Sequence, residues 1–191
     1  MNSGGVHGKG KRHGGQEFHQ FYQGKGGEAG TAELVRSCPS EQAELLTKPI
    51  LPVGWYDFGD VIGLLLEADR AFAQGDKKLL YEAGVYNARQ DLRGLYRFFI
   101  KAASPQFIIN NSARVWKQYY DKGEMAVAYQ KPKRGALKMT GFPDIPLGHD
   151  IEQLGYMEEA FRMSGGKGIR GSHPKCQARG DDCCLYEFTW E

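Results

Sequence analysis

The sequence lacks any long apolar run. Crossing a bilayer takes roughly 18 or more consecutive apolar residues, whereas the best candidate, Val61 to Leu66, is six residues long and lies between Asp60 and Glu67. The N-terminus also lacks the apolar segment of a secretory signal. We therefore expect a cytoplasmic protein with no membrane span.

An excess of charge of one sign and a cysteine framework are missing too. The 25 basic and 23 acidic residues leave a formal net charge of +2. No extended nucleic-acid surface is expected, because such a surface needs clustered excess Lys and Arg. Four Cys, three of them near the C-terminus, fit a reducing compartment better than a disulfide framework. What remains is the composition of an ordinary globular domain with one core.

The first 15 residues contain six Gly and little apolar surface. Such a segment cannot bury enough area to offset the entropy lost on ordering. We predict a flexible, basic, Gly-rich tail over residues 1–15 and a single domain over residues 16–191.

Apolar residues then recur at helical spacing through the middle of the chain. Short helices are expected over 17–48, and Asp57 is placed to cap the next helix. A further helix begins near residue 79, and its continuation to residue 100 is open. Ser104 followed by Pro105 indicates the start of another helix. These segments predict a helical layer.

After Gly123 the apolar period changes from about 3.6 to 2. Residues 124–129 and 137–140 predict a hairpin, 150–163 an amphipathic helix, and the segments near 167–172 and 183–190 two further strands. The fold class we expect is α+β, with a helical layer packed on an antiparallel sheet of about four strands.

Several stretches resemble a group of uncharacterised bacterial proteins. They are Ile50 to Tyr56, Asp91 to Tyr96, Ser104-Pro105, Trp116 to Gly123 and His173 to Cys184. That group is similar to 4-vinyl-reductase-type domains and, more distantly, to heme–nitric-oxide-binding domains and Golgi transport-particle subunits. The resemblance covers roughly residues 30–191 and implies the ligand-binding fold of nitric-oxide signalling and Golgi transport.

The resemblance implies a non-enzymatic sensor or regulatory domain that binds a small hydrophobic or aromatic molecule and signals to a protein partner. Two alternatives stay open. One is a protein-interaction scaffold without a small ligand, and the other is a reductase acting on a tetrapyrrole vinyl group. A homodimer is also open.

The motif C-x3-G-x3-C runs from Cys176 through Gly180 to Cys184. A Gly-centred turn between two strand ends can bring two thiolates to one tetrahedral ion. In the phenol-sensing relatives similar cysteines help to hold zinc, with another Cys on the preceding helix, where this chain has Asp150. The candidate zinc ligands are therefore Cys176, Cys184, His173 and Asp150. The alternative, which the missing Cys favours, is that both Cys are small buried hydrophobes.

A heme would need an axial ligand, in heme sensors a His on a helix facing a large apolar pocket. His7, His13 and His19 lie in or near the tail, and His149 and His173 lie at the ends of predicted elements. None lies within a strong apolar helix face, so we do not expect heme.

Aromatic side chains with a polar atom suit a pocket for a planar or lipophilic ligand. The candidate pocket residues are Trp55, Tyr56, Tyr96, Trp116, Tyr119 and Tyr120. For each of them the alternative is an ordinary place in the core. Asp57 and Asp60 are better explained as groups at a helix start than as a catalytic pair, and no catalytic residue is predicted.

Overall fold

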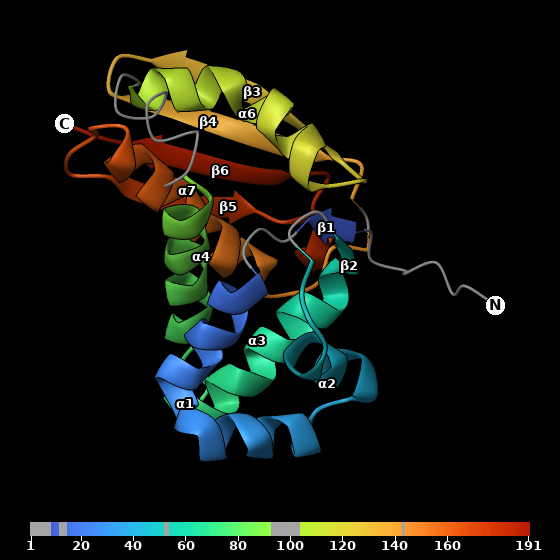
Figure 1. Ribbon diagram of the computed structural model, residues 1–191. Helices are drawn as coiled ribbons and strands as arrows, with labels where there is room; N and C mark the ends of the chain where they lie inside the picture. The colour runs from blue at the N-terminus through green and yellow to red at the C-terminus, as the bar shows by residue number, and fades with distance from the viewer. Residues whose placement is uncertain (1–8, 12–14, 52–53, 93–103, 143) are drawn as a thin grey trace.

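The computed structural model describes residues 9–11, 15–51, 54–92, 104–142 and 144–191. Within them, helices pack on a four-stranded antiparallel sheet (Figure 1), which confirms the α+β class. Among the described helices, none combines the length and the apolar character needed to cross a membrane.

The described residues form six α-helices and six strands. The helices are α1 (Gly15–Ser37), α2 (Ser40–Thr47), α3 (Phe58–Ala73), α4 (Lys78–Asp91), α6 (Pro105–Tyr119) and α7 (His149–Met163). The strands are β1 (Lys9–Lys11), β2 (Trp55–Asp57), β3 (Glu124–Lys131), β4 (Arg134–Thr140), β5 (Arg170–Lys175) and β6 (Cys184–Thr189).

Two of the helices begin where the sequence predicts, and side chains explain why. The Asp57 carboxylate accepts hydrogen bonds from the backbone N–H groups of Gly59 (2.8 Å) and Asp60 (3.2 Å). The Ser104 hydroxyl accepts one from the N–H of Phe107 at 3.3 Å, with Pro in the first turn of α6. Both side chains satisfy amide groups that a helix start leaves without partners.

Asp69 interrupts the apolar face of α3, yet it is almost fully buried. Its two carboxylate oxygens accept hydrogen bonds from the backbone N–H groups of Lys77 (2.9 Å) and Leu79 (3.2 Å). A buried carboxylate needs such partners. Asp69 therefore ties the start of α4 to α3.

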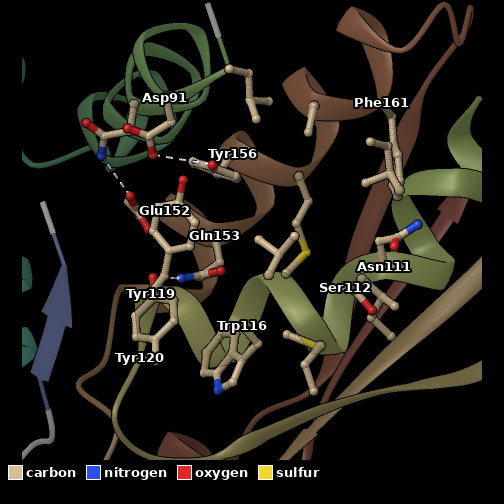
Figure 2. Close-up of a pocket in the computed structure, with 18 of the residues that line it drawn as sticks. Asp91, Asn111, Ser112, Trp116, Tyr119, Tyr120, Glu152, Gln153, Tyr156 and Phe161 are labelled. Atoms are coloured by element: carbon tan, nitrogen blue, oxygen red, sulfur yellow. Dashed lines mark hydrogen bonds between the residues drawn. The ribbon is translucent and has the colours of Figure 1, made fainter. Parts of the chain in front are cut away.

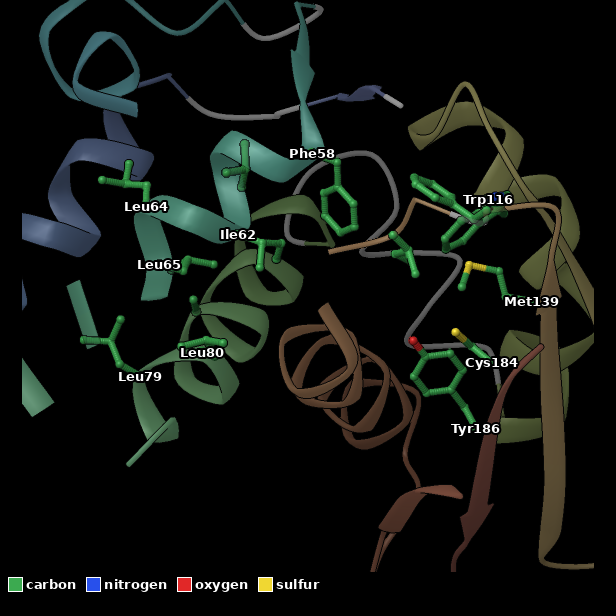
Figure 3. Packing of buried hydrophobic residues seen from close by; sticks show 14 of the residues in the cluster. Phe58, Ile62, Leu64, Leu65, Leu79, Leu80, Trp116, Met139, Cys184 and Tyr186 are labelled. Carbon is green, nitrogen blue, oxygen red and sulfur yellow. The ribbon is translucent and has the colours of Figure 1, made fainter. Parts of the chain in front are cut away.

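The main sheet has the strand order β3-β4-β6-β5, and all neighbouring pairs are antiparallel. In the β4–β6 register, Leu137 pairs with Tyr186 and Met139 pairs with Cys184. All four side chains are buried. Figure 3 shows α7 between this face of the sheet and the apolar side chains of α3 and α4. The core therefore lies on both sides of α7.

The short strand β1 lies inside the segment that composition marks as a tail. Lys9–Lys11 pairs antiparallel with Trp55–Asp57 of β2. Backbone pairing of this kind requires no apolar side chain, so composition alone gave no sign of it. For residues 1–8 and 12–14, which are outside the described part of the chain, the tail stays a prediction.

Helices α4 and α7 cross at two glycines. A Cβ atom added at Gly84 would lie 2.0 Å from the carbonyl oxygen of Glu152, and one added at Gly155 would lie 2.3 Å from that of Tyr81. Both obstacles are backbone atoms of the other helix. The two backbones are therefore closer than any side chain at these positions allows.

Candidate functional site

A cavity of about 190 Å³ lies between α6, α7 and the sheet (Figure 2). Most of its wall is apolar. This wall includes Ile108, Trp116, Met125, Leu137, Met157 and Phe161. A largely apolar wall that carries a few oriented polar groups is typical of small-molecule sites.

The polar groups gather where α4 meets α7 (Figure 2). The Tyr156 hydroxyl donates to the Asp91 carboxylate at 3.3 Å, and the Asn87 amide donates to the Glu152 carboxylate at 3.0 Å. Desolvation of its hydroxyl, and next the charge of Asp91, raise the pKa of Tyr156 well above its usual value. Tyr156 therefore stays a hydrogen-bond donor at neutral pH, and this end of the cavity is held in one arrangement.

Four of the six aromatic residues predicted for a pocket line this cavity. They are Tyr56, Trp116, Tyr119 and Tyr120. The rings of Trp116 and Tyr120 stack, with centroids 4.1 Å apart and planes 19° apart. Trp55 is 42% exposed on β2 and does not line the cavity. Tyr96 lies outside the described residues. Binding of a ligand by these residues stays a prediction.

Sequence reasoning missed the polar residues that α7 contributes. The apolar stripe through Ile151 and Phe161 indicated one buried face, but α7 also buries polar side chains, because α4 packs on it from the other side. Glu152 and Gln153 are only 4% and 6% exposed. A helix enclosed from two sides keeps little solvated surface, and periodicity does not reveal such an environment.

A second cluster lies at the start of α7. Four side chains each bring one ligand atom to within 4.8 Å of the others: His149, His173, Cys176 and Cys184. The Nε2 atom of His149 is 3.5 Å from the sulfur of Cys184 and 3.9 Å from that of Cys176. Ligand atoms of a tetrahedral zinc ion are separated by roughly 3.3–3.8 Å, given zinc–sulfur and zinc–nitrogen bonds of about 2.3 and 2.0 Å. The cluster therefore has the donor types and nearly the spacing of a zinc site.

Neighbouring groups orient the cluster. Nδ1 of His149 donates to the backbone carbonyl of Pro146 at 2.7 Å, which leaves Nε2 as a lone-pair donor toward the two sulfurs. The backbone N–H of Gln177 donates to the sulfur of Cys184 at 3.3 Å. Both ring nitrogens of His173 are buried and make no hydrogen bond among the described residues, and Nδ1 faces the Asp150 carboxylate at 3.6 Å. An ion at the centre would give Nε2 of His173 the partner that a buried polar group requires.

In the sequence, Asp150 is the fourth candidate ligand. In the structure the fourth ligand atom of the cluster comes from its neighbour His149. The Asp150 carboxylate lies behind the cluster, 3.6 Å from Nδ1 of His173 and 3.1 Å from the Arg179 guanidinium. Burial alone would raise the pKa of Asp150, but contact with His173 and the charge of Arg179 lower it well below its usual range. A charged carboxylate behind a ligating His is a usual supporting partner in zinc sites.

Burial governs protonation in the cluster. It lowers the pKa of His149 to about 4 and raises the pKa of the Cys184 thiol. Each shift favours the neutral form of the group. A dication between the two sulfurs would favour the thiolates instead, because it compensates their charge.

No model of a known protein family matches the chain, and no curated protein matches it. Solved structures do match. The Fe(II) unliganded H-NOX protein from K. algicida has 14% identity and a TM-score of 0.66, over 92% of this chain and 93% of that chain. The S. oneidensis H-NOX protein in the Fe(II)NO ligation state has 12% identity and a TM-score of 0.68, over 92% and 96%. A mutant of the T. Tengcongensis H-NOX protein has 10% identity and a TM-score of 0.65, over 91% and 93%.

Identities this low establish the fold alone. The chain has the α+β fold of H-NOX proteins, in line with the more distant part of the sequence resemblance. The narrower resemblance to 4-vinyl-reductase-type domains stays a prediction.

Proposed function

We propose that the chain is a ligand-sensing domain that binds a small apolar or aromatic molecule and signals its occupancy to a protein partner. The cavity between α6, α7 and the sheet carries the proposal, because it joins an apolar wall to an oriented polar end. Its volume of about 190 Å³ is below the roughly 300–1,000 Å³ of pockets for drug-sized ligands. A cavity of this size suits a small molecule of one or two aromatic rings rather than a drug-sized one.

Heme is one candidate ligand, because the names of solved structures with this fold refer to Fe(II) and to heme distortion. The described residues that line the cavity include no His, and they include no Lys or Arg to pair with the two heme propionates. The described residues of the cavity therefore do not fit heme, and we propose a smaller ligand.

The absence of heme binding can be tested with added hemin. The protein should give the broad absorption of loosely bound hemin, because a sharp Soret band requires an axial ligand from the protein. The measurement is an absorption titration of both oxidation states. A sharp band that disappears when Ala160 is replaced by Phe would show heme in the cavity and contradict the proposal.

Ligand binding can be tested with 2-naphthol, a two-ring probe of the expected size. We expect the wild-type protein to bind it with a micromolar Kd, measured by calorimetry and by the fluorescence of Trp116 and its neighbours. Ala160 is buried and lines the cavity, so Ala160→Phe should fill the site and weaken binding at least tenfold, about 1.4 kcal/mol.

The matched control is Ala113→Phe, which adds the same side chain to an exposed position of α6. It should bind 2-naphthol like the wild type. No binding by the wild type, or equal binding by Ala160→Phe, would rule out this cavity as the ligand site.

We also propose that His149, His173, Cys176 and Cys184 hold one zinc ion. Four protein ligands complete a tetrahedral shell, and such closed sites are structural rather than catalytic. The ion would join the start of α7 to the turn between β5 and β6. Because α7 also forms one wall of the cavity, the ion would hold that wall in place.

A further inference from the structure

The hydroxyl of Ser112, on α6, is buried without a partner. Ser112 is 9% exposed, and its Oγ atom has no hydrogen bond among the described residues. A Ser or Thr inside a helix can donate to the carbonyl four residues earlier. Thr31 and Thr47 do so here, at 2.8 and 3.0 Å. Ser112 does not make this bond, although it too lies within a helix.

Ser112 lines the cavity on the side away from the polar residues of α4 and α7 (Figure 2). Asn111 is the labelled residue nearest to it in this view, and its amide already donates to the carbonyl of Phe107 at 2.9 Å. A buried hydroxyl needs a hydrogen-bond partner. A water molecule needs two to four polar partners of its own, and among the described residues labelled on this side only Ser112 and Asn111 have polar side chains. A polar atom of the ligand meets the requirement better.

We propose that Ser112 selects the ligand by a hydrogen bond to a neutral polar substituent, a hydroxyl, ether or carbonyl oxygen, on a small aromatic ring system. The proposal rests on the ligand-binding function proposed above. The ring system fills the apolar part of the cavity beside Trp116, and the substituent points toward α6. The substituent is neutral, because a charged group would meet no opposite charge among the described residues on this side. An oriented hydroxyl rejects a ligand that lacks the matching group, since binding would leave it without a partner.

Three probes with the same rings test the proposal: 2-naphthol, 2-methoxynaphthalene and 2-methylnaphthalene. The measured quantity is the ratio of the Kd of 2-methylnaphthalene to that of 2-naphthol, by calorimetry. In Ser112→Ala this ratio should fall about tenfold from the wild-type value, the loss expected for one hydrogen bond in a buried site. The methoxy probe separates donation by Ser112 from acceptance, because its oxygen can only accept.

Two controls keep the result specific. Ser112→Ala should leave the Tm of the ligand-free protein unchanged or slightly raised, because it removes a hydroxyl that has no partner. Thr47→Ala removes a hydroxyl that is bonded within α2 and should leave the ratio unchanged. If Ser112→Ala still binds 2-naphthol and its Kd ratio equals that of the wild type, Ser112 does not select the ligand, and the proposed ligand-binding function stands. Failure of all three probes to bind the wild type overturns that function and the selection by Ser112.

Discussion

Replacing Gly155 with Ala should lower the Tm by about 10 °C. The added Cβ atom would lie 2.3 Å from the backbone carbonyl of Tyr81, so α4 and α7 would have to separate. Overpacking of this kind costs about 3 kcal/mol or more when the obstacle cannot rotate away. In a domain of this size each kcal/mol shifts the Tm by about 2–4 °C. Gly84→Ala, with its Cβ 2.0 Å from the Glu152 carbonyl, should do at least as much.

The matched control is Gly24→Ala in α1, where an added Cβ atom meets nothing within 4 Å. There the change should be neutral or stabilising by about 0.5–1 kcal/mol, because Ala favours a helix over Gly. Thermal unfolding followed by circular dichroism compares the three variants with the wild type. A Tm within 2 °C of the wild type for Gly155→Ala would show that the two helices do not meet at this glycine.

Local chemistry made much of the fold predictable. The change of apolar period after Gly123 separated the helices from the main sheet, and the caps at Asp57 and Ser104 placed two helix starts. Each of these signals involves residues that are close in sequence. The helix crossing is different, because Gly84 and Gly155 are far apart along the chain. A Gly inside a helix costs about 1 kcal/mol, so both were signals of close packing, but nothing local joins them.

The candidate metal ligands show the same division. The motif from Cys176 to Cys184 is local, and it brings two sulfurs together with His173. The choice between His149 and Asp150 is not local, because neighbouring helical residues point about 100° apart. Which of them faces the turn depends on how α7 packs on α4 and the sheet. The sequence therefore pointed to the start of this helix for a fourth ligand, and in the structure His149 is the residue of this pair whose ligand atom joins the cluster.

Removing the proposed zinc ion should lower the Tm by 10 °C or more. The purified protein should contain about one zinc per chain, measured by elemental analysis, and a chelator should destabilise it. An ion that binds only the folded state adds about 4 kcal/mol when its free concentration is 1,000 times its Kd. Cys184→Ser should lose the zinc. Acidification should release it as well, because protons compete for the thiolates and imidazoles.

Cys183→Ser is the matched control for the cysteine variant. Cys183 is buried beside Cys184 but lies outside the cluster, so this variant should keep its zinc. If the cysteines are only small core residues, the protein will contain no zinc and chelation will leave the Tm unchanged. Cys184→Ala would then carry only a core penalty of about 1–2 kcal/mol.

A comparison of His149→Asn with Asp150→Asn decides which residue of α7 is the ligand. His149→Asn removes a nitrogen 3.5 Å from the sulfur of Cys184 and should abolish stoichiometric zinc. Asp150→Asn keeps all four ligands and removes only the charge behind His173. It should weaken zinc binding by about 10- to 100-fold, the usual effect of losing a supporting partner. At micromolar free zinc the variant should still contain about one zinc per chain. The opposite pattern, with zinc lost in Asp150→Asn and kept in His149→Asn, would return Asp150 to the ligand set.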